Sequence, residues 1–168
     1  MPMRLTTFTD FTLRTLIYLA VRPSRLVTIA EIATAYGIPD THLNKVVNQL
    51  ALAGDVRTVR GRHGGLKLAR EMEQINIGAV LRRTEAGLAL TGCFDCQNCT
   101  IQDHCVLKGA LREALAAFTN VVDSYTLADL VENRAALSRL LGISADDGAA
   151  AVNRGGFAAA SVPVGLLQ

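Results

Sequence analysis

Four cysteines, all that the 168-residue chain contains, lie within thirteen positions, in the stretch CFDCQNCTIQDHC at residues 93–105. Their spacing is C-x2-C-x2-C-x5-C, and such a cluster could form disulfides, hold a metal or carry out redox chemistry. Zinc sites usually take two ligand pairs separated by a longer segment, whereas closely successive cysteines are typical of iron–sulfur clusters. A redox couple normally lies at a helix N-terminus that activates one thiol. The spacing therefore favours an iron–sulfur cluster over zinc, and either over a redox couple.

The composition indicates that disulfides are not needed for folding. At 168 residues and 50% hydrophobic, the chain is long enough to bury a core without cross-links. Its first apolar run, FTLRTLIYLAV, is short and contains Arg14, which fits neither a secretory signal nor a membrane span. We therefore expect a cytoplasmic protein with no membrane partner. In that reducing compartment a cysteine cluster binds metal more often than it forms disulfides.

A cysteine-dependent enzyme is the least favoured alternative. Its nucleophilic thiol would need a histidine or carboxylate partner. The nearest histidine, His104, lies within the cysteine stretch itself, and no site for metabolic catalysis is visible elsewhere. The sequence therefore predicts that the protein is not an enzyme.

Basic residues are concentrated in the first part of the chain. Residues 1–70 contain ten Lys and Arg against four Asp and Glu, a net charge of +6, whereas residues 71–168 contain seven against eleven, a net charge of −4. A basic surface suits contact with nucleic-acid phosphates, although ordinary solvated surfaces can carry a similar charge.

Three helices are expected before residue 55. Apolar residues recur with three- and four-residue spacing from residue 10 to 20, which predicts the first helix. Thr28 and Glu31 form a capping-box pattern at the start of the second, and Gly37 ends it. After the turn GIPD, Asp40 is expected to be the N-cap of the third.

The second and third of these helices have the outline of a helix-turn-helix, because a short turn containing glycine joins them. The third would be the recognition helix, whose outward side chains can reach base edges or phosphates in a major groove. A plain helical hairpin with a polar surface is the alternative. The candidate DNA-binding residues of this pair are Thr28, Thr41, His42, Asn44, Lys45 and Asn48.

A basic β-hairpin is expected directly after the helix pair. In DVRTVRGRHGGLKLA, apolar and basic residues alternate, and the glycines mark a turn between two short strands. A helix-turn-helix followed by such a hairpin is a winged helix, whose wing can follow the DNA backbone or enter a minor groove. A solvated surface hairpin is the less favoured alternative. The candidate DNA-binding residues of the wing are Arg57, Arg60, Arg62 and His63.

The rest of the chain predicts a mainly helical fold. Asn76 and Thr126 are expected to cap short helices, and a wide apolar stripe between residues 107 and 122 predicts a long helix. That stripe needs a partner, which a symmetric homodimer supplies, although it could instead pack on its own domain. We therefore predict a mainly α fold with a small β-hairpin, a winged helix-turn-helix and a long dimerisation helix.

The predicted organisation has four parts. A winged helix-turn-helix DNA-binding domain occupies residues 1–88, and a cluster-binding loop occupies residues 89–106. The dimerisation helix and a following short helix occupy residues 107–142. The last part, residues 143–168, is rich in alanine and glycine without periodicity and is expected to be a disordered tail.

Together these parts resemble the winged-helix iron–sulfur transcription regulators, a family that includes NsrR, IscR and RirA. The resemblance covers residues 3 to about 142. It is carried by the opening MRLTTFTDFTLRTLIYLA, the helix pair TIAEIATAYGIPDTHLNKVVNQLALAGDV, the wing VRGRHGGLKLA, the cysteine loop and YTLADLV.

The resemblance also implies a ligand set. The family's ligating cysteines follow C-x5-C-x5-C, which here matches Cys93, Cys99 and Cys105, so Cys96 is an alternative ligand or a spare thiol. IscR-like members have a histidine where this chain has Lys108, whereas NsrR-like members share the FTD motif. In that branch, the residue at the place of Asp10 supplies an oxygen ligand from the other subunit.

The function implied is that of an NsrR-like repressor. Such a dimer would bind a double-stranded DNA operator and hold a 4Fe-4S cluster, with a 2Fe-2S cluster or zinc as the alternatives. Nitrosylation of the cluster by nitric oxide would release the DNA and derepress nitric-oxide-response genes. A regulator of the same family that responds to iron or cluster status is the nearest rival. A zinc-binding structural module that never binds DNA is the other.

Overall fold

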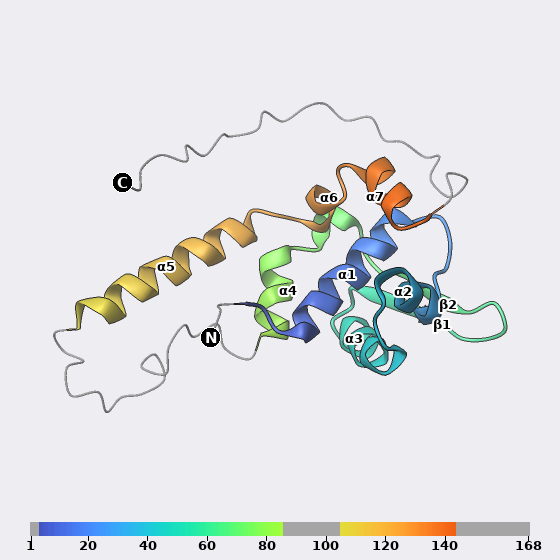
Figure 1. Ribbon diagram of the computed structural model, residues 1–168, viewed down its shortest axis with the longest axis horizontal. Coiled ribbons are helices and arrows are strands. Elements are labelled where there is room, and N and C mark those ends of the chain that lie inside the picture. The colour runs from blue at the N-terminus through green and yellow to red at the C-terminus, as the bar shows by residue number, and fades with distance from the viewer. Residues whose placement is uncertain (1–3, 86–104, 144–168) are drawn as a thin grey trace.

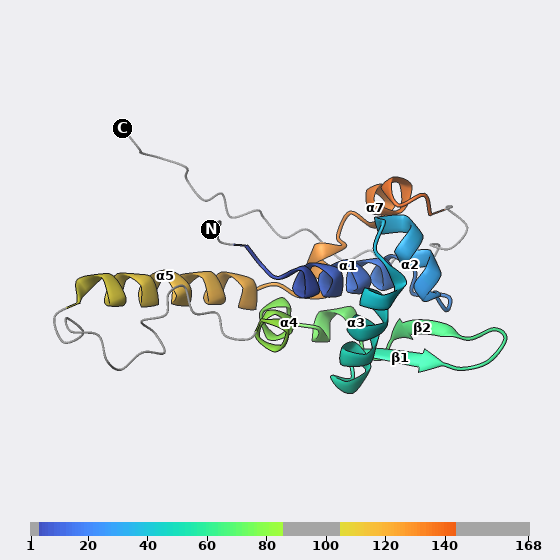
Figure 2. The same cartoon turned by 60° about the horizontal axis from the view of Figure 1, so that its bottom comes forward.

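The computed structural model describes residues 4–85 and 105–143. Within these ranges helices dominate and the strands form one two-stranded antiparallel sheet, so the predicted mainly helical fold with a small hairpin is confirmed. Helices α1 to α4 and the hairpin form a compact body, and α5 extends away from it (Figures 1 and 2). Most of the predicted loop at 89–106, and the predicted tail beyond residue 143, lie outside the described residues.

Helix α1 (Thr7–Val21) passes through the middle of the body. It starts earlier than residue 10, because Thr6 is its N-cap and accepts a hydrogen bond from the Thr9 N–H at 3.3 Å. Thr12 and Thr15 are buried, and each donates its hydroxyl at 2.8 Å to a carbonyl oxygen one turn earlier. Because these polar groups are satisfied within the helix, α1 can be covered on several sides.

Helices α2 (Ile29–Tyr36) and α3 (Asp40–Leu52) form the predicted helix-turn-helix. The capping box between Thr28 and Glu31 is present, and Gly37 ends α2 in the left-handed region with φ of 64°. The predicted N-cap of α3 was wrong. Pro39 occupies the cap position without a side-chain bond, and Asp40 is the first helical residue, where its charge favours the helix dipole.

Strands β1 (Val56–Val59) and β2 (Gly65–Leu68) form the wing, with Val56 opposite Leu68 and Val59 opposite Gly65. The turn between them requires glycine at Gly61, whose φ is 117°. Leu66 also bridges Val27 through two backbone hydrogen bonds of 2.7 and 2.9 Å. The segment before α2 therefore fixes the wing to the helix-turn-helix.

Helix α4 (Ile77–Thr84) begins at the predicted cap Asn76 and packs on α1. Helix α5 (Val106–Asp123) is the predicted long helix and packs on α4 near its C-terminal end. Helix α6 (Leu127–Leu130) begins with the predicted cap at Thr126. The short helix η1 (Met72–Gln74) and helix α7 (Arg134–Leu140) were not predicted, because neither is long enough to show a periodic pattern.

The core lies where α1, α3, α4, α6 and the wing meet, and its members come from all parts of the described chain. The largest fully buried side chains are Leu16, Leu19, Ile32, Leu43, Ile75 and Leu127.

In the described ranges, no helix is both long and apolar enough to cross a membrane.

Candidate nucleic-acid interface and cysteine site

Helix α3 divides cleanly into a buried and a polar face. Leu43, Val46, Val47 and Leu50 are buried, at intervals of three and four residues, so they face the core. The five residues predicted to contact DNA are all exposed, and they leave a continuous polar strip along the helix. They are Thr41, His42, Asn44, Lys45 and Asn48.

An open cleft runs between α3 and the wing. Asn44 and Asn48 line it from α3, Thr28 from the start of α2, and Thr58 from β1. The fold thus brings together three of the predicted residues, which lie up to twenty positions apart, and adds Thr58, which was not predicted. All four side chains can donate and accept hydrogen bonds, which is the chemistry needed at base edges and phosphates.

Two residues of the polar strip are already engaged. The ring of His42 packs edge-on against Phe11 of α1, with 5.8 Å between the ring centroids. Asn44 Nδ2 donates to the Asp40 carbonyl oxygen at 2.8 Å. His42 is thereby anchored to α1, and the Asn44 amide must turn away from its own helix to read a base.

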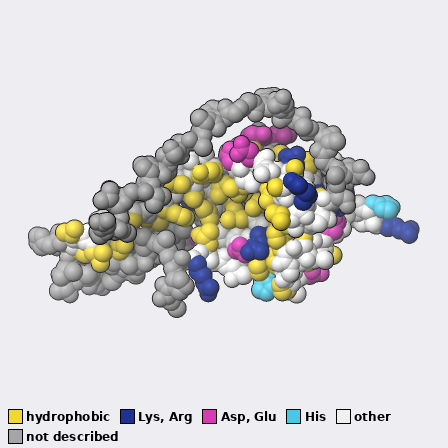
Figure 3. Space-filling model, turned by 45° about the horizontal axis from the view of Figure 1, so that its top comes forward, with side chains coloured by type: hydrophobic (Ala, Val, Ile, Leu, Met, Phe, Trp, Pro, Cys, Tyr) yellow, Lys and Arg dark blue, Asp and Glu magenta, His cyan; other side chains and the backbone are white. Residues whose placement is uncertain are grey.

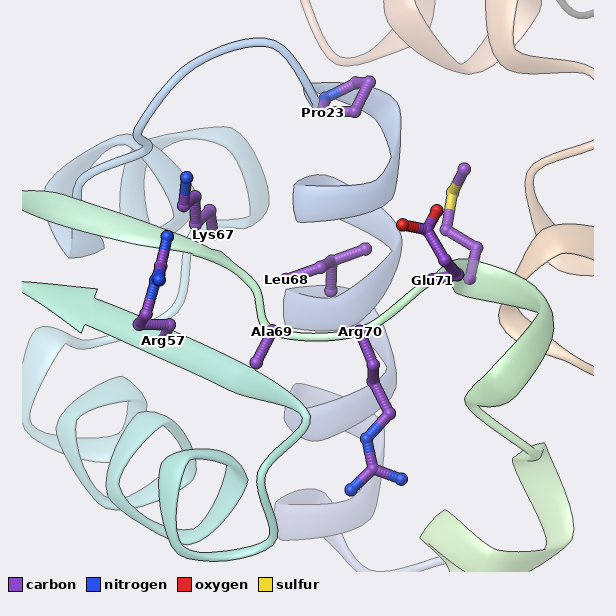
Figure 4. Close-up of a pocket in the computed structure, with 8 residues that line it drawn as sticks. Pro23, Arg57, Lys67, Leu68, Ala69, Arg70 and Glu71 are labelled. Carbon is purple, nitrogen blue, oxygen red and sulfur yellow. The ribbon is translucent and has the colours of Figure 1, made fainter.

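The predicted wing residues are all exposed but do not share one face. Arg60, Arg62 and His63 lie in the turn between the strands, at the far end of the projecting hairpin, where basic and histidine side chains are visible (Figure 3). Arg57 lies on the opposite face of β1 from Thr58, in a second cleft (Figure 4). The structure therefore separates Arg57 from the cleft beside α3.

A buried carboxylate, Asp55, fixes the base of the wing. It is 1% exposed and pairs with Arg83 of α4, and the Arg70 Nε atom lies 3.5 Å from it. Arg70 also donates to the carbonyl oxygens of Gly54 at 3.1 Å and Ala53 at 3.0 Å. This group of charges was not predicted from the sequence. A lone acidic residue next to an apolar strand was the available signal, but its arginine partners lie 15 and 28 positions away.

The end of α4 contacts α5 and the start of α1. Arg82 pairs with Asp123 of α5 at 2.7 Å, and Thr84 accepts a hydrogen bond from Thr9 of α1 at 2.9 Å. Glu85 accepts the Thr6 N–H at 2.8 Å. Partial burial acts to raise the pKa of Glu85, but the hydrogen bonds that its carboxylate accepts from Thr9 and Thr6 outweigh burial and lower the pKa. The chain enters the cysteine loop from this anchored turn.

Glu31 carries the charge at the start of α2. It accepts hydrogen bonds from the Thr28 N–H and hydroxyl, both at 3.0 Å, and pairs with Arg22 at 3.0 Å and with Arg25. Burial acts to raise the pKa of Glu31, but the bonds from Thr28 and Arg25 outweigh it and lower the pKa. The carboxylate therefore stays ionised and keeps the cap of α2 closed.

Of the predicted cluster ligands, Cys93, Cys96 and Cys99 lie outside the described residues. Cys105 is described. It is the N-cap of α5, and its sulfur accepts the Lys108 N–H at 3.4 Å. Cysteine binds a metal through this sulfur atom. Within the described ranges, no group of three or more metal-binding side chains comes together.

Asp10, the predicted oxygen ligand, lies in the first turn of α1. Its carboxylate is 2.9 Å from the Arg14 Nε atom, and the two side chains are 46% and 43% exposed. The carboxylate is therefore reachable from outside the chain while it is paired within it. Of the predicted ligands, the structure thus describes one sulfur donor, Cys105, and one oxygen donor, Asp10, and sulfur is the donor that iron–sulfur clusters require.

The apolar stripe of α5 is covered only in part. Phe118 and Val122 pack against the core, whereas Val106 is 85% and Leu107 63% exposed. Two large apolar side chains at one end of a projecting helix form a surface that a second protein chain could bury.

A family model described as Rrf2, an iron-dependent transcriptional regulator, matches residues 5–133. The chain is 46% identical over 142 residues to the "HTH-type transcriptional regulator NsrR" of Bacillus subtilis, which covers 83% of this chain and 97% of that protein. It is 44% identical over 142 residues to the protein of the same name from Halalkalibacterium halodurans, with the same coverage of both chains.

Solved structures show the same fold. The IscR of T. potens superposes with a TM-score of 0.64 at 26% identity, covering 78% of this chain and 88% of that one. CymR of B. subtilis, described as the global cysteine regulator, superposes with a TM-score of 0.66 at 23% identity, covering 79% of this chain and 98% of that one. The second likeness concerns the fold alone.

Proposed function

Because the chain belongs to the Rrf2 family of transcriptional regulators, we propose that it is a dimeric, DNA-binding repressor whose 4Fe-4S cluster senses nitric oxide. The observation that carries the DNA-binding part is the exposed polar strip of α3 beside a cleft shared with the wing. The nitric-oxide part is supported by the similarity to proteins named NsrR, together with Asp10 and the cysteine spacing.

In this proposal α3 enters the major groove. Asn48 and Asn44 present amides that can pair with a base edge, and Lys45 contacts a phosphate. Thr28 contacts the backbone from the start of α2, with Thr41 and His42 at the other end of the strip. Arg60, Arg62 and His63 approach the neighbouring minor groove from the tip of the wing.

The proposed dimer uses the exposed end of α5. In a twofold dimer, both chains use the same surface patch, so one interface would bury the exposed side chains of Val106 and Leu107 in both copies. A dimer also presents two α3 helices, which matches a palindromic operator with half-sites one helical turn apart. The proposal keeps the four parts predicted from the sequence, residues 1–88, 89–106, 107–142 and 143–168. A regulator that binds DNA works where the DNA is, so we propose that the protein is cytoplasmic.

We assign the cluster to Cys93, Cys99 and Cys105 of one subunit and Asp10 of the other, with Cys96 as a spare or alternative thiol. When bound, a 4Fe-4S cluster supplies iron that reacts with nitric oxide. Cys105 contributes a sulfur from the N-cap position of α5. Asp10 contributes a single oxygen from an exposed position that it can leave without unfolding its helix.

A short path joins Asp10 to the DNA-binding strip. Phe11, the next residue, packs against His42 of α3, and α1 packs along α3 more widely. A shift at the start of α1 would therefore move the recognition helix. Because operator binding depends on the spacing of two such helices, a small shift in each subunit is enough to weaken it.

The DNA-binding part is tested with a duplex selected by the protein from a random pool. We expect the binding constant to fall steeply with salt, and Lys45→Gln to reduce the slope by about one. Asn48→Ala should cost about 1–3 kcal/mol and relax specificity at one position. Arg139→Gln, on α7, is the matched surface control. A wild type without salt-dependent binding would rule out the DNA-binding proposal.

The cluster is tested by measuring iron, acid-labile sulfide and zinc per chain after purification without oxygen. About four iron and four sulfide per chain, with a visible spectrum that nitric oxide bleaches, would support the proposal. Iron and sulfide with no response to nitric oxide would favour the iron-responsive alternative, which the description of the family supports. Zinc without sulfide would favour a structural metal site.

The dimer is tested by sedimentation of the full chain and of Leu107→Glu. The exposed position of Leu107 means that a charge there leaves the folded subunit intact. We expect the wild type to sediment as a dimer and the variant to dissociate at concentrations where the wild type does not. Equal dissociation of the two would place the interface elsewhere.

A further inference from the structure

Asp55 joins both ends of the wing to the rest of the fold. Its N–H donates at 3.0 Å to the Leu50 carbonyl oxygen of α3, and its carbonyl oxygen accepts the N–H of Ala69, directly after β2, at 2.9 Å. Val56, the next residue, begins β1. The two strands therefore meet at Asp55, and a shift of this residue would move the whole hairpin.

The carboxylate of Asp55 ties this junction to α4. It is 1% exposed and pairs with Arg83 in the last turn of α4. The Arg70 Nε atom lies 3.5 Å from the other carboxylate oxygen, but Arg70 follows β2 and belongs to the junction itself. Charge-assisted hydrogen bonds are strong, and shielding from water strengthens them further. Arg83 is thus the partner that connects the base of the wing to a separate helix.

Helix α4 can support the wing because it is itself held to α5. Arg82, the neighbour of Arg83, pairs with Asp123 of α5 at 2.7 Å. At the other end of α4, the Asn76 side chain donates to the carbonyl oxygens of Asp123 at 2.7 Å and Tyr125 at 3.2 Å. Asp123 therefore contacts both ends of α4, so α4 and the last turn of α5 are held as one unit.

A projecting hairpin magnifies small movements at its base. Gly61, in the turn, follows Val56 by five residues, which corresponds to about 17 Å of strand at roughly 3.4 Å per residue. A tilt of about 10° at the base would then move the tip by about 3 Å, the length of a hydrogen bond. Contacts that Arg60 and Arg62 make at the tip therefore depend on how firmly the base of the wing is held.

We propose that Arg83 is a positioning residue for DNA binding, which holds the wing in place through Asp55 and does not itself contact DNA. The inference rests on the proposed DNA-binding function and adds a residue that acts on it from another helix. Loss of the ion pair leaves the hairpin attached to the core, because Val56 and Leu66 are buried and Leu66 is hydrogen-bonded to Val27. What is lost is the fixed direction of the wing.

The test is a double-mutant cycle with the full-length protein and a duplex selected by it from a random pool. Arg60→Gln removes a contact at the wing tip and should weaken binding by the otherwise wild-type protein about tenfold. In the Arg83→Gln background the same change should cost less than about threefold, since the wing no longer holds Arg60 against the DNA. Arg83→Lys keeps a positive charge beside Asp55 and should restore most of the Arg60 effect.

Leu137→Ala is the control for stability. It trims a partly buried side chain of α7, which packs on α1, and should leave the Arg60→Gln effect at about tenfold. An equal Arg60→Gln effect with and without Arg83 would overturn the proposal. So would a reduced effect in Leu137→Ala, because the effect would then follow stability. The same holds for no effect in the wild type, which would leave no tip contact to position. A wild type without salt-dependent binding would instead contradict the proposed function.

Discussion

The Arg14 Nε atom lies 2.9 Å from the Asp10 carboxylate, one turn further along α1. The carboxylate proposed to bind the cluster of the partner subunit is thus paired within its own chain. The pair is about half exposed, so it contributes little to stability, and a stronger partner can take the carboxylate from it. Arg14 also lies over the Tyr36 ring, 5.6 Å from its centre, and this second contact does not depend on Asp10.

Asp10→Ala should leave the stability of the metal-free protein nearly unchanged, within about 0.5 kcal/mol, because an exposed i,i+4 ion pair is worth no more. It should weaken the release of DNA by nitric oxide. Arg14→Gln removes the same ion pair but keeps the carboxylate, so release should persist. For both variants, thermal unfolding measures the stability, and DNA binding with and without nitric oxide measures the release. Normal release in Asp10→Ala would exclude the cross-subunit ligand.

Asp55→Asn should destabilise the protein by about 2–3 kcal/mol. The change removes the charge that neutralises Arg83 and Arg70, and these arginines are about one-third exposed, so the cost falls below that of breaking a fully buried pair. Arg82→Gln is the matched control. Its ion pair with Asp123 is more exposed and should cost less than about 1 kcal/mol. Urea unfolding measures both, and equal losses would contradict the role of Asp55 at the base of the wing.

Glu31 makes part of the stability depend on pH. Its pKa is lower in the folded chain than in the unfolded chain, so its contribution is fully present above the unfolded value, about 4.3, and is lost as the pH falls through the folded value. Glu31→Gln should therefore lower the melting temperature at pH 7 by an amount equivalent to about 1 kcal/mol. The difference from the wild type should shrink as the pH falls below about 4. A constant difference from pH 7 to 3 would show that ionisation of Glu31 is not involved.

Gly78 and Gly109 should respond oppositely to alanine. A Cβ at Gly78 would lie 1.8 Å from the Asp123 side chain and 3.1 Å from its Cα atom, so Gly78→Ala should separate α4 from α5 and cost about 1–3 kcal/mol. At Gly109 in α5 a Cβ meets nothing within 4 Å, so Gly109→Ala should stabilise by about 0.5–1 kcal/mol. Thermal unfolding of both variants tests the docking of α5. Stabilisation by both would show that α5 does not rest on α4 as described.

The sequence by itself determined the features that depend on residues close along the chain. The capping box of Thr28 and Glu31, the left-handed Gly37 and the hairpin turn were predictable, because each is set within a few positions by backbone and side-chain hydrogen bonds. The polar strip of α3 followed from its helical period in the same way. The start of α3 was misassigned because Pro39 and Asp40 both suit a helix start, at different positions.

Only the tertiary structure decided which of these residues work together. It placed Thr58 beside α3 and Arg57 on the far face of the wing, because neighbouring residues of a strand point in opposite directions and packing selects the inner face. It also joined Asp55 to Arg83, 28 positions away. No local pattern encodes such a pair, since burying a carboxylate is favourable only where the folded chain brings its counter-charge to it.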